Sequence, residues 1–224
     1  MRIYEVKQAS LNFKWTFDRI IPALPGPGSP AFADLCKELS PYGLQAAKIS
    51  LETPTSRFGD VVLGIALLDD LVGVWIRSSE FELFCRDLYD EDIEVLIKIT
   101  ESIFTAVKSI DADAVRGKAT IKMSAHLQIE QFTSKEFLYE HLPQAESLTA
   151  LIPEAAVYDI KPLAGSNAFA IRVFLANSAL YNDSLFVEVS INYQNISEIQ
   201  FLAKGAEKDY RAVLEMLGLV EKAE

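Results

Sequence analysis

Apolar and polar residues alternate along much of this 224-residue chain, and that period of two is typical of half-buried β-strands. The opening segment, residues 2–17, is the clearest example, because Leu11, Phe13, Trp15 and Phe17 all fall on one side of it. Further strand patterns cover 45–53, 58–68, 72–84, 118–132, 156–160, 169–175 and 185–192. Strands that follow one another after short turns favour antiparallel sheets and an α+β protein.

Helical spacing interrupts these strands at four main places. A helix is expected after Ser29-Pro30, with proline at its first position, and it should end at Pro41-Tyr-Gly43. The clearest helix covers Asp90–Ile110, with Asp90 as its cap. Another begins at Ser134, and 206–220 closes the chain. A short helical pattern also covers 145–151, and the prolines and glycines of 22–30 predict a long loop.

The order of these elements repeats. Strand, loop, helix, three strands and helix occur once before a boundary at 111–116 and once after it. Paired landmarks are Phe32 with Phe137, Phe58 with Phe169 and Val74 with Val187, at separations of 105, 111 and 113 residues. The expected architecture is therefore α+β, with two tandem related β-α-β-β-β-α halves, mainly antiparallel sheets and helices packed on one face.

The halves are residues 1–112 and 113–224. Chance similarity in the order of elements is the competing interpretation, because few residues are identical between the two halves. The two sheets could join edge to edge into one continuous domain, or they could pack as separate layers.

Charge restricts the partners. The chain has 21 basic and 32 acidic residues, a net charge of −11, and no run of Lys or Arg, so binding to nucleic acid or to an anionic membrane is disfavoured. A protein partner or self-association is expected, and a small-molecule ligand is possible. The sequence has neither a leader pattern nor a run of about 18 apolar residues, so we expect a cytoplasmic protein.

The residue types that usually carry chemistry form no recognisable site. No glycine-rich phosphate loop, nucleophile elbow or HExxH motif occurs, and no cofactor or metal is expected. Cys36 and Cys85 are interpreted as free thiols, and His126 and His141 as structural residues, although a histidine dyad with a serine or cysteine would need a contact that sequence cannot show. The acidic cluster at residues 87–94 suits a helix N-terminus better than a cation loop.

An amphipathic patch on the sheet is the leading candidate site. Trp75 and Arg77 alternate with Val74 and Ile76, and Phe186 and Glu188 are their counterparts in the second half. If these four side chains face away from the helices, they suit a protein partner. The sequence therefore favours a non-catalytic binding or assembly protein that uses a sheet face, a sheet edge or the groove between halves. A small-ligand-binding protein or an enzyme with a site in the cleft between the halves is the alternative.

Overall fold

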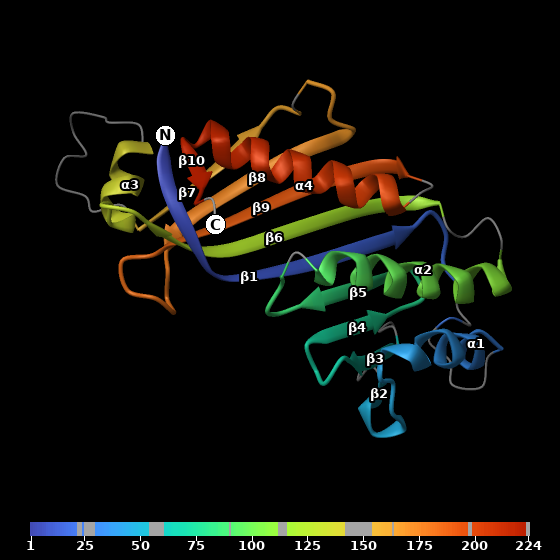
Figure 1. Ribbon diagram of the computed structural model, residues 1–224. Helices are drawn as coiled ribbons and strands as arrows, with labels where there is room; N and C mark the ends of the chain where they lie inside the picture. The colour runs from blue at the N-terminus through green and yellow to red at the C-terminus, as the bar shows by residue number, and fades with distance from the viewer. Residues whose placement is uncertain are drawn as a thin grey trace.

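The protein is a mixed α+β structure whose described residues form one large, mainly antiparallel sheet and four α-helices (Figure 1). The computed structural model describes the whole chain except residues 22–23, 25–29, 54–60, 90, 112–115, 142–153, 163, 197–198 and 223–224. The side chains of residues 30, 195–196 and 199–201 are likewise left undescribed.

Nine strands follow one another across the sheet in the order β2-β3-β4-β5-β1-β6-β9-β8-β7. The first five in the chain are β1 (Arg2–Phe17), β2 (Ile49–Glu52), β3 (Val62–Leu67), β4 (Val72–Ile76) and β5 (Glu80–Cys85). The others are β6 (Gly117–Ile129), β7 (Ala155–Ile160), β8 (Ala168–Asn177) and β9 (Leu185–Ile196). The tenth strand, β10 (Leu219–Glu221), pairs in parallel with the start of β1.

The long strands β1 and β6 form the centre of the sheet, where they pair antiparallel from Tyr4↔Ile129 to Phe17↔Gly117. The register shifts between Val6 and Gln8, and β1 bends there (Figure 1). The strands β2 to β5 of the first half lie on the β1 side of this central pair and β7 to β9 of the second half lie on the β6 side, whereas β10 of the second half pairs with the start of β1. All the described strands therefore belong to one continuous sheet.

Two long helices, α2 (Asp92–Ile110) and α4 (Ile199–Met216), lie across one face of the sheet (Figure 1). The shorter α1 (Pro30–Leu39) packs against α2, and α3 (Ser134–His141) packs against β7 and β8. The face beneath the helices carries the apolar half of each strand. Its largest fully buried side chains include Trp15 and Phe81.

Aromatic rings join α2 to the sheet. Phe104 of α2 meets the ring of Trp15 edge-on at 4.8 Å between centroids and the ring of Phe81 at 5.4 Å. Phe13 and Phe17 also contact Phe81. Such edge-to-face pairs add to the apolar burial that holds the helix on its strands.

Several boundaries differ from those expected. The segment 72–84 is two strands, because the Arg77 N–H donates to the Glu80 carbonyl at 2.8 Å and turns the chain between β4 and β5. Among its described residues the first half therefore has four strands after α1, and not three. In the segment 45–53, residues 46–48 form a 3-10 turn, and only Ile49–Glu52 is strand.

The helix ends also differ in detail. Thr133, and not Ser134, caps α3, because the Glu136 N–H donates to Thr133 Oγ1 while the Thr133 N–H donates to Glu136 Oε2. The closing helix starts earlier than expected and ends at Met216, since Gly218 at φ +75° turns the chain into β10. The expected cap Asp90, the expected helix at 145–151 and most of the loop at 22–30 lie outside the described residues.

Candidate binding surfaces

The sheet has a second face, opposite the four described helices, which we call the open face. It consists of the alternate side chains that point away from the buried core. From Gln8 of β1 onward, the charged ones within the strands and the β4–β5 turn are Lys14, Glu52, Arg77, Glu80, Glu82, Lys118, Lys122, Asp159, Arg172 and Glu188. Along the central strands β1, β6 and β9 every open-face side chain from Gln8 onward is half-buried or exposed.

Charge is balanced on the open face although it is unbalanced in the chain. The ten residues listed above are five basic and five acidic, whereas the whole chain carries −11. Glu80 joins two of the cations, because its carboxylate lies 3.1 Å from Arg77 Nη1 and 2.6 Å from Lys14 Nζ. By contrast, Lys118, Lys122 and Glu188 form no ion pair with the described residues.

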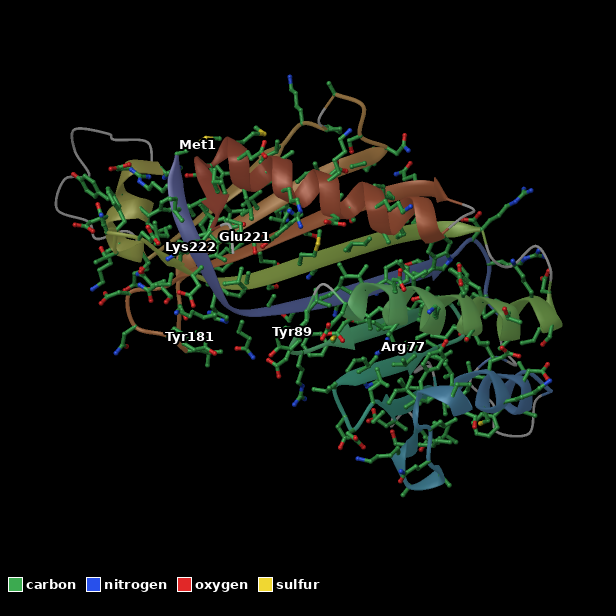
Figure 2. All side chains as sticks on the ribbon, in the orientation of Figure 1. Met1, Arg77, Tyr89, Tyr181, Glu221 and Lys222 are labelled. Atoms are coloured by element: carbon green, nitrogen blue, oxygen red, sulfur yellow. The ribbon has the colours of Figure 1, made fainter. Side chains whose placement is uncertain are left out.

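The structure places all four residues singled out from the sequence on the open face. It does not bring them together as one patch. Trp75 belongs to β4 and Phe186 to β9, four strand spacings apart, or about 19 Å. Arg77 forms an ion pair with Glu80 at the turn after β4. Figure 2 labels Arg77 at the end of the sheet that carries β4 and β5. The open face therefore has two separate aromatic ends joined by a polar middle.

Around Trp75 the open face is hollowed. A cavity of about 220 Å³ is bounded by two aromatic side chains, two glycines and polar groups of the neighbouring turns, namely Lys48, Ser50, Gly64, Ile65, Ala66, Asp70, Leu71, Val72, Gly73, Trp75, Phe84 and Arg86. Trp75 is 36% exposed. Sequence reasoning found Trp75 but missed Arg86, which follows the end of β5 and gives no period-two signal.

The other aromatic end gathers around Phe186. Its ring lies 6.0 Å from that of Phe174 and 5.0 Å from the imidazole of His126, which also meets Tyr181 at 5.4 Å. His126 Nδ1 lies 2.8 Å from Ser178 Oγ. Burial lowers the pKa of His126, which favours the neutral imidazole.

His126 and Ser178 are as close as the two members of a catalytic dyad, but the groups around them differ from those of a dyad. Ser178 Oγ already accepts the backbone N–H groups of Leu180 and Tyr181, at 3.1 and 2.9 Å. Those two bonds hold the hydroxyl within a turn, and no carboxylate among the described residues forms a hydrogen bond with the imidazole. We therefore assign His126 a structural role.

His141 also has structural partners. Its Nδ1 lies 2.9 Å from the Phe137 carbonyl, its Nε2 lies 3.2 Å from the Leu217 carbonyl, and its ring stacks on Phe137. It therefore ties the end of α3 to the end of α4. Both cysteines are free thiols, and burial raises the pKa of Cys36 and raises that of Cys85 to about 11. Neither thiol is suited to act as a nucleophile at neutral pH.

A second hollow lies on the helix side, where the two halves of the chain meet. It measures about 80 Å³ between α2, α4 and the central strands, and its lining is almost entirely apolar: Leu11, Phe13, Leu83, Leu88, Ile93, Leu96, Ile97, Thr100, Ile121, Met123, Leu202, Ala203, Ala206 and Glu207. The hydroxyl of Thr100 is used within α2, because it donates to the Leu96 carbonyl at 2.8 Å. This hollow therefore offers almost no polar group to bind or activate a polar ligand.

The described residues contain no group of three His, Cys, Asp or Glu side chains that could hold a metal ion. No helix in the described part of the chain is long and apolar enough to cross a bilayer. No protein-family model matches the chain, and no curated protein matches it in sequence. The candidate surfaces are therefore argued from the geometry of this structure alone.

Proposed function

We propose that this is a non-catalytic binding and assembly protein of the cytoplasm, and that the open face is the surface on which a second copy of the chain docks. The observation that carries the proposal is the balance of five basic and five acidic side chains among the ten open-face residues named above, in a chain with a net charge of −11. Two equally charged copies repel each other, and a face without net charge is where they approach at least cost.

The distribution of these charges is self-complementary. Lys118 and Lys122 lie on β6 and Glu188 lies on the adjacent strand β9, and none of the three is used in an ion pair with the described residues. A twofold axis parallel to the strands, above the boundary between β6 and β9, places β6 of each copy opposite β9 of the other. Lys122 of one copy then lies within reach of Glu188 of the other.

Aromatic side chains supply the apolar part of this contact. Phe174 and Phe186 stand beside Glu188 on the open face, and both are half-buried. Facing sheets pack about 10 Å apart, a distance that aromatic side chains fill. Buried aromatic anchors near the centre of an interface usually contribute most of the binding free energy.

Charge reversal tests the proposal in solution. The substitutions Lys122→Glu and Glu188→Lys should each shift the dimer–monomer equilibrium toward monomer by about tenfold or more, and the double variant should restore the dimer. Mass measurement by light scattering over a dilution series reads the result. Lys98→Glu is the matched control, because Lys98 is an exposed residue on α2, on the opposite side of the sheet. A wild-type chain that stays monomeric at all concentrations would overturn the proposal.

We further propose that the two halves, residues 1–112 and 113–224, arose from one duplicated unit. The sheet order supports this, because β1-β5-β4-β3-β2 runs outward on one side of the centre and β6-β9-β8-β7 on the other. A long helix closes each half, α2 and then α4. Superposing β1, β5 and α2 on β6, β9 and α4 tests the idea, and helices that cross their strands at unlike angles would contradict it.

A small-ligand-binding function is the second candidate, and the apolar hollow between α2 and α4 favours it. At about 80 Å³ it is roughly half the size of an engineered cavity that holds benzene, so a short alkyl group would fit. A thermal-shift screen with short aliphatic ligands tests this function. Ala206→Leu, which fills the hollow, should abolish any shift, whereas a uniformly flat response of the wild-type protein would count against it.

A further inference from the structure

We propose that the hollow beside Trp75 is a binding site for a small aromatic carboxylate. This site goes beyond self-association, because it lies on the part of the open face that a second copy does not cover. With the twofold axis described above, the β7 edge of one sheet lies opposite β5 of the other. The strands β2, β3 and β4 then extend past the partner, and the hollow stays open to solvent.

The walls of the hollow select a flat, apolar group. Trp75 and Phe84 both face it, and they lie on adjacent rows of the paired strands, since Gly73 is opposite Phe84 and Trp75 is opposite Glu82. Aromatic rings bind other rings by offset or edge-on stacking. At about 220 Å³ the hollow is larger than the engineered cavity of about 150 Å³ that takes benzene, so one ring with a substituent fits.

The hollow has room for a ligand partly because two of its lining residues, Gly64 and Gly73, have no side chain. A Cβ at Gly64 would lie 2.5 Å from Ser50 Oγ, and a Cβ at Gly73 would lie 2.9 Å from Cη2 of Trp75. Any larger residue at either position would therefore displace the groups that shape the site. Because Gly73 has no side chain, the indole of Trp75 can lie against the strand, and this contact holds one aromatic wall of the hollow in place.

A cation without a counter-ion sets the charge of the ligand. Arg86 lines the hollow and is exposed, and its guanidinium forms no ion pair with the described residues. The other cation of the lining, Lys48, is already paired with Asp70. A guanidinium binds a carboxylate through two parallel hydrogen bonds, which favours a carboxylate over an uncharged group.

A hydroxyl is available for the second oxygen of the ligand. Ser50 Oγ lies 3.5 Å from the Gly64 carbonyl, at the limit of a hydrogen bond, so its proton can turn toward a ligand at little cost. The hollow thus combines an aromatic wall, a guanidinium without an ion pair to the described residues and a hydroxyl held only by one long hydrogen bond. A single ring bearing one carboxylate satisfies all three.

Binding can be followed through Trp75, because the only other tryptophan, Trp15, is buried at 1% exposure. We use benzoate as the probe, with benzyl alcohol as the uncharged analogue and cyclohexanecarboxylate as the non-aromatic acid. Isothermal titration calorimetry should show that benzoate binds about tenfold more tightly than either analogue. In a separate fluorescence titration, benzoate should quench the tryptophan emission of the wild-type protein but not that of Trp75→Phe.

Two variants locate the site. Arg86→Gln should weaken benzoate binding by about tenfold and remove the preference over benzyl alcohol, whereas Lys98→Gln on the far side of the sheet should leave both unchanged. Circular dichroism of each variant establishes that it is folded. Absence of benzoate binding at millimolar concentration would overturn the proposal, as would equal binding to Arg86→Gln. Neither result depends on whether the chain forms a dimer.

Discussion

The indole of Trp75 lies back along its own strand over Gly73, so that a Cβ at Gly73 would stand 2.9 Å from Cη2 and 3.2 Å from Cζ3 of the ring. Glycine within a strand usually weakens it, because it adds no side-chain packing. Here the ring of Trp75 covers the place that a side chain would have occupied. The pair explains how the indole is held flat against the open face of the sheet.

Replacing Gly73 by alanine should therefore move the ring and not the strand. The contact is with the far end of a side chain that can rotate, so we expect the free energy of unfolding to change by no more than about 1 kcal/mol. The emission of Trp75 should shift to longer wavelength as the ring swings into water. Fluorescence of Gly73→Ala against wild type measures this, and an unchanged spectrum would contradict the described position of the indole.

Substitution by alanine should lower the free energy of unfolding at Gly117 and raise it at Gly205. A Cβ at Gly117 would lie 2.1 Å from the backbone carbonyl oxygen of Thr16 and 2.8 Å from Trp15 Nε1, so the central strands must separate. We expect Gly117→Ala to cost about 3 kcal/mol. Gly205 of α4 has no atom within 4 Å of its would-be Cβ, and Gly205→Ala should stabilise the helix by about 0.5 to 1 kcal/mol. Urea unfolding of both variants checks the pair.

Asp209 is a buried carboxylate that depends on two hydroxyl donors. It is 2% exposed, and its Oδ2 accepts hydrogen bonds from Ser166 Oγ at 2.6 Å and from the Tyr193 hydroxyl at 3.1 Å. Burial, and then the charge of Asp209, raise the pKa of Tyr193, so its hydroxyl keeps its proton and remains a donor. Tyr193→Phe should cost about 2 kcal/mol, since a buried charge loses one donor.

A double-mutant cycle gives the control for this pair. If the loss in Tyr193→Phe comes from Asp209, the same change should cost clearly less in an Asp209→Asn background. Equal costs in the two backgrounds would show that Tyr193 acts through packing alone. Urea denaturation at neutral pH supplies the four free energies of unfolding.

His126 should make the protein less stable in mild acid. Its pKa in the folded protein lies below the ordinary 6.5, because burial disfavours the imidazolium. The unfolded chain therefore binds the proton more readily, and the stability that is present above pH 6.5 is lost as the pH falls toward the lowered folded pKa. Unfolding followed between neutral pH and about pH 5 should show this slope.

His126→Gln is the comparison for that measurement. Glutamine can still hydrogen-bond Ser178 Oγ but does not titrate, so the variant should lose less stability over the same range of pH. His141→Gln serves as a second comparison, because His141 is the other histidine of the chain. If wild type and His126→Gln showed the same dependence on pH, the assignment of the effect to His126 would be wrong.

Local pattern was enough for most strands and helices and for part of the candidate site. The alternation from Leu11 to Phe17 placed one face of β1 in the core, and the same alternation separated Trp75 from Val74 and Ile76. The turn that divides β4 from β5 was missed, because Arg77-Ser-Ser-Glu80 contains neither glycine nor proline. Thr133 was passed over for Ser134 because both residues make good caps.

Residues that act through distant neighbours could not be assigned in this way. Arg86 became a candidate only when β3, β4 and β5 were brought side by side, since no spacing in the sequence links it to Trp75. The same holds for Asp209, whose partners Ser166 and Tyr193 lie 43 and 16 residues away. Side-chain periodicity reports which face a residue occupies, and it contains no information about which strand is next to it.

The sequence by itself determined the α+β class, the acidic character and the separation of Trp75 and Arg77 from Val74 and Ile76, because these follow from composition and from a period of two. The tertiary structure decided that Trp75, Arg77, Phe186 and Glu188 lie on the face opposite the helices. Only the tertiary structure decided that β1 and β6 pair at the centre and that Trp75 and Phe186 stand four strands apart. The physical reason is that pairing between distant strands depends on the fit of whole surfaces and on loop closure, which no local pattern records.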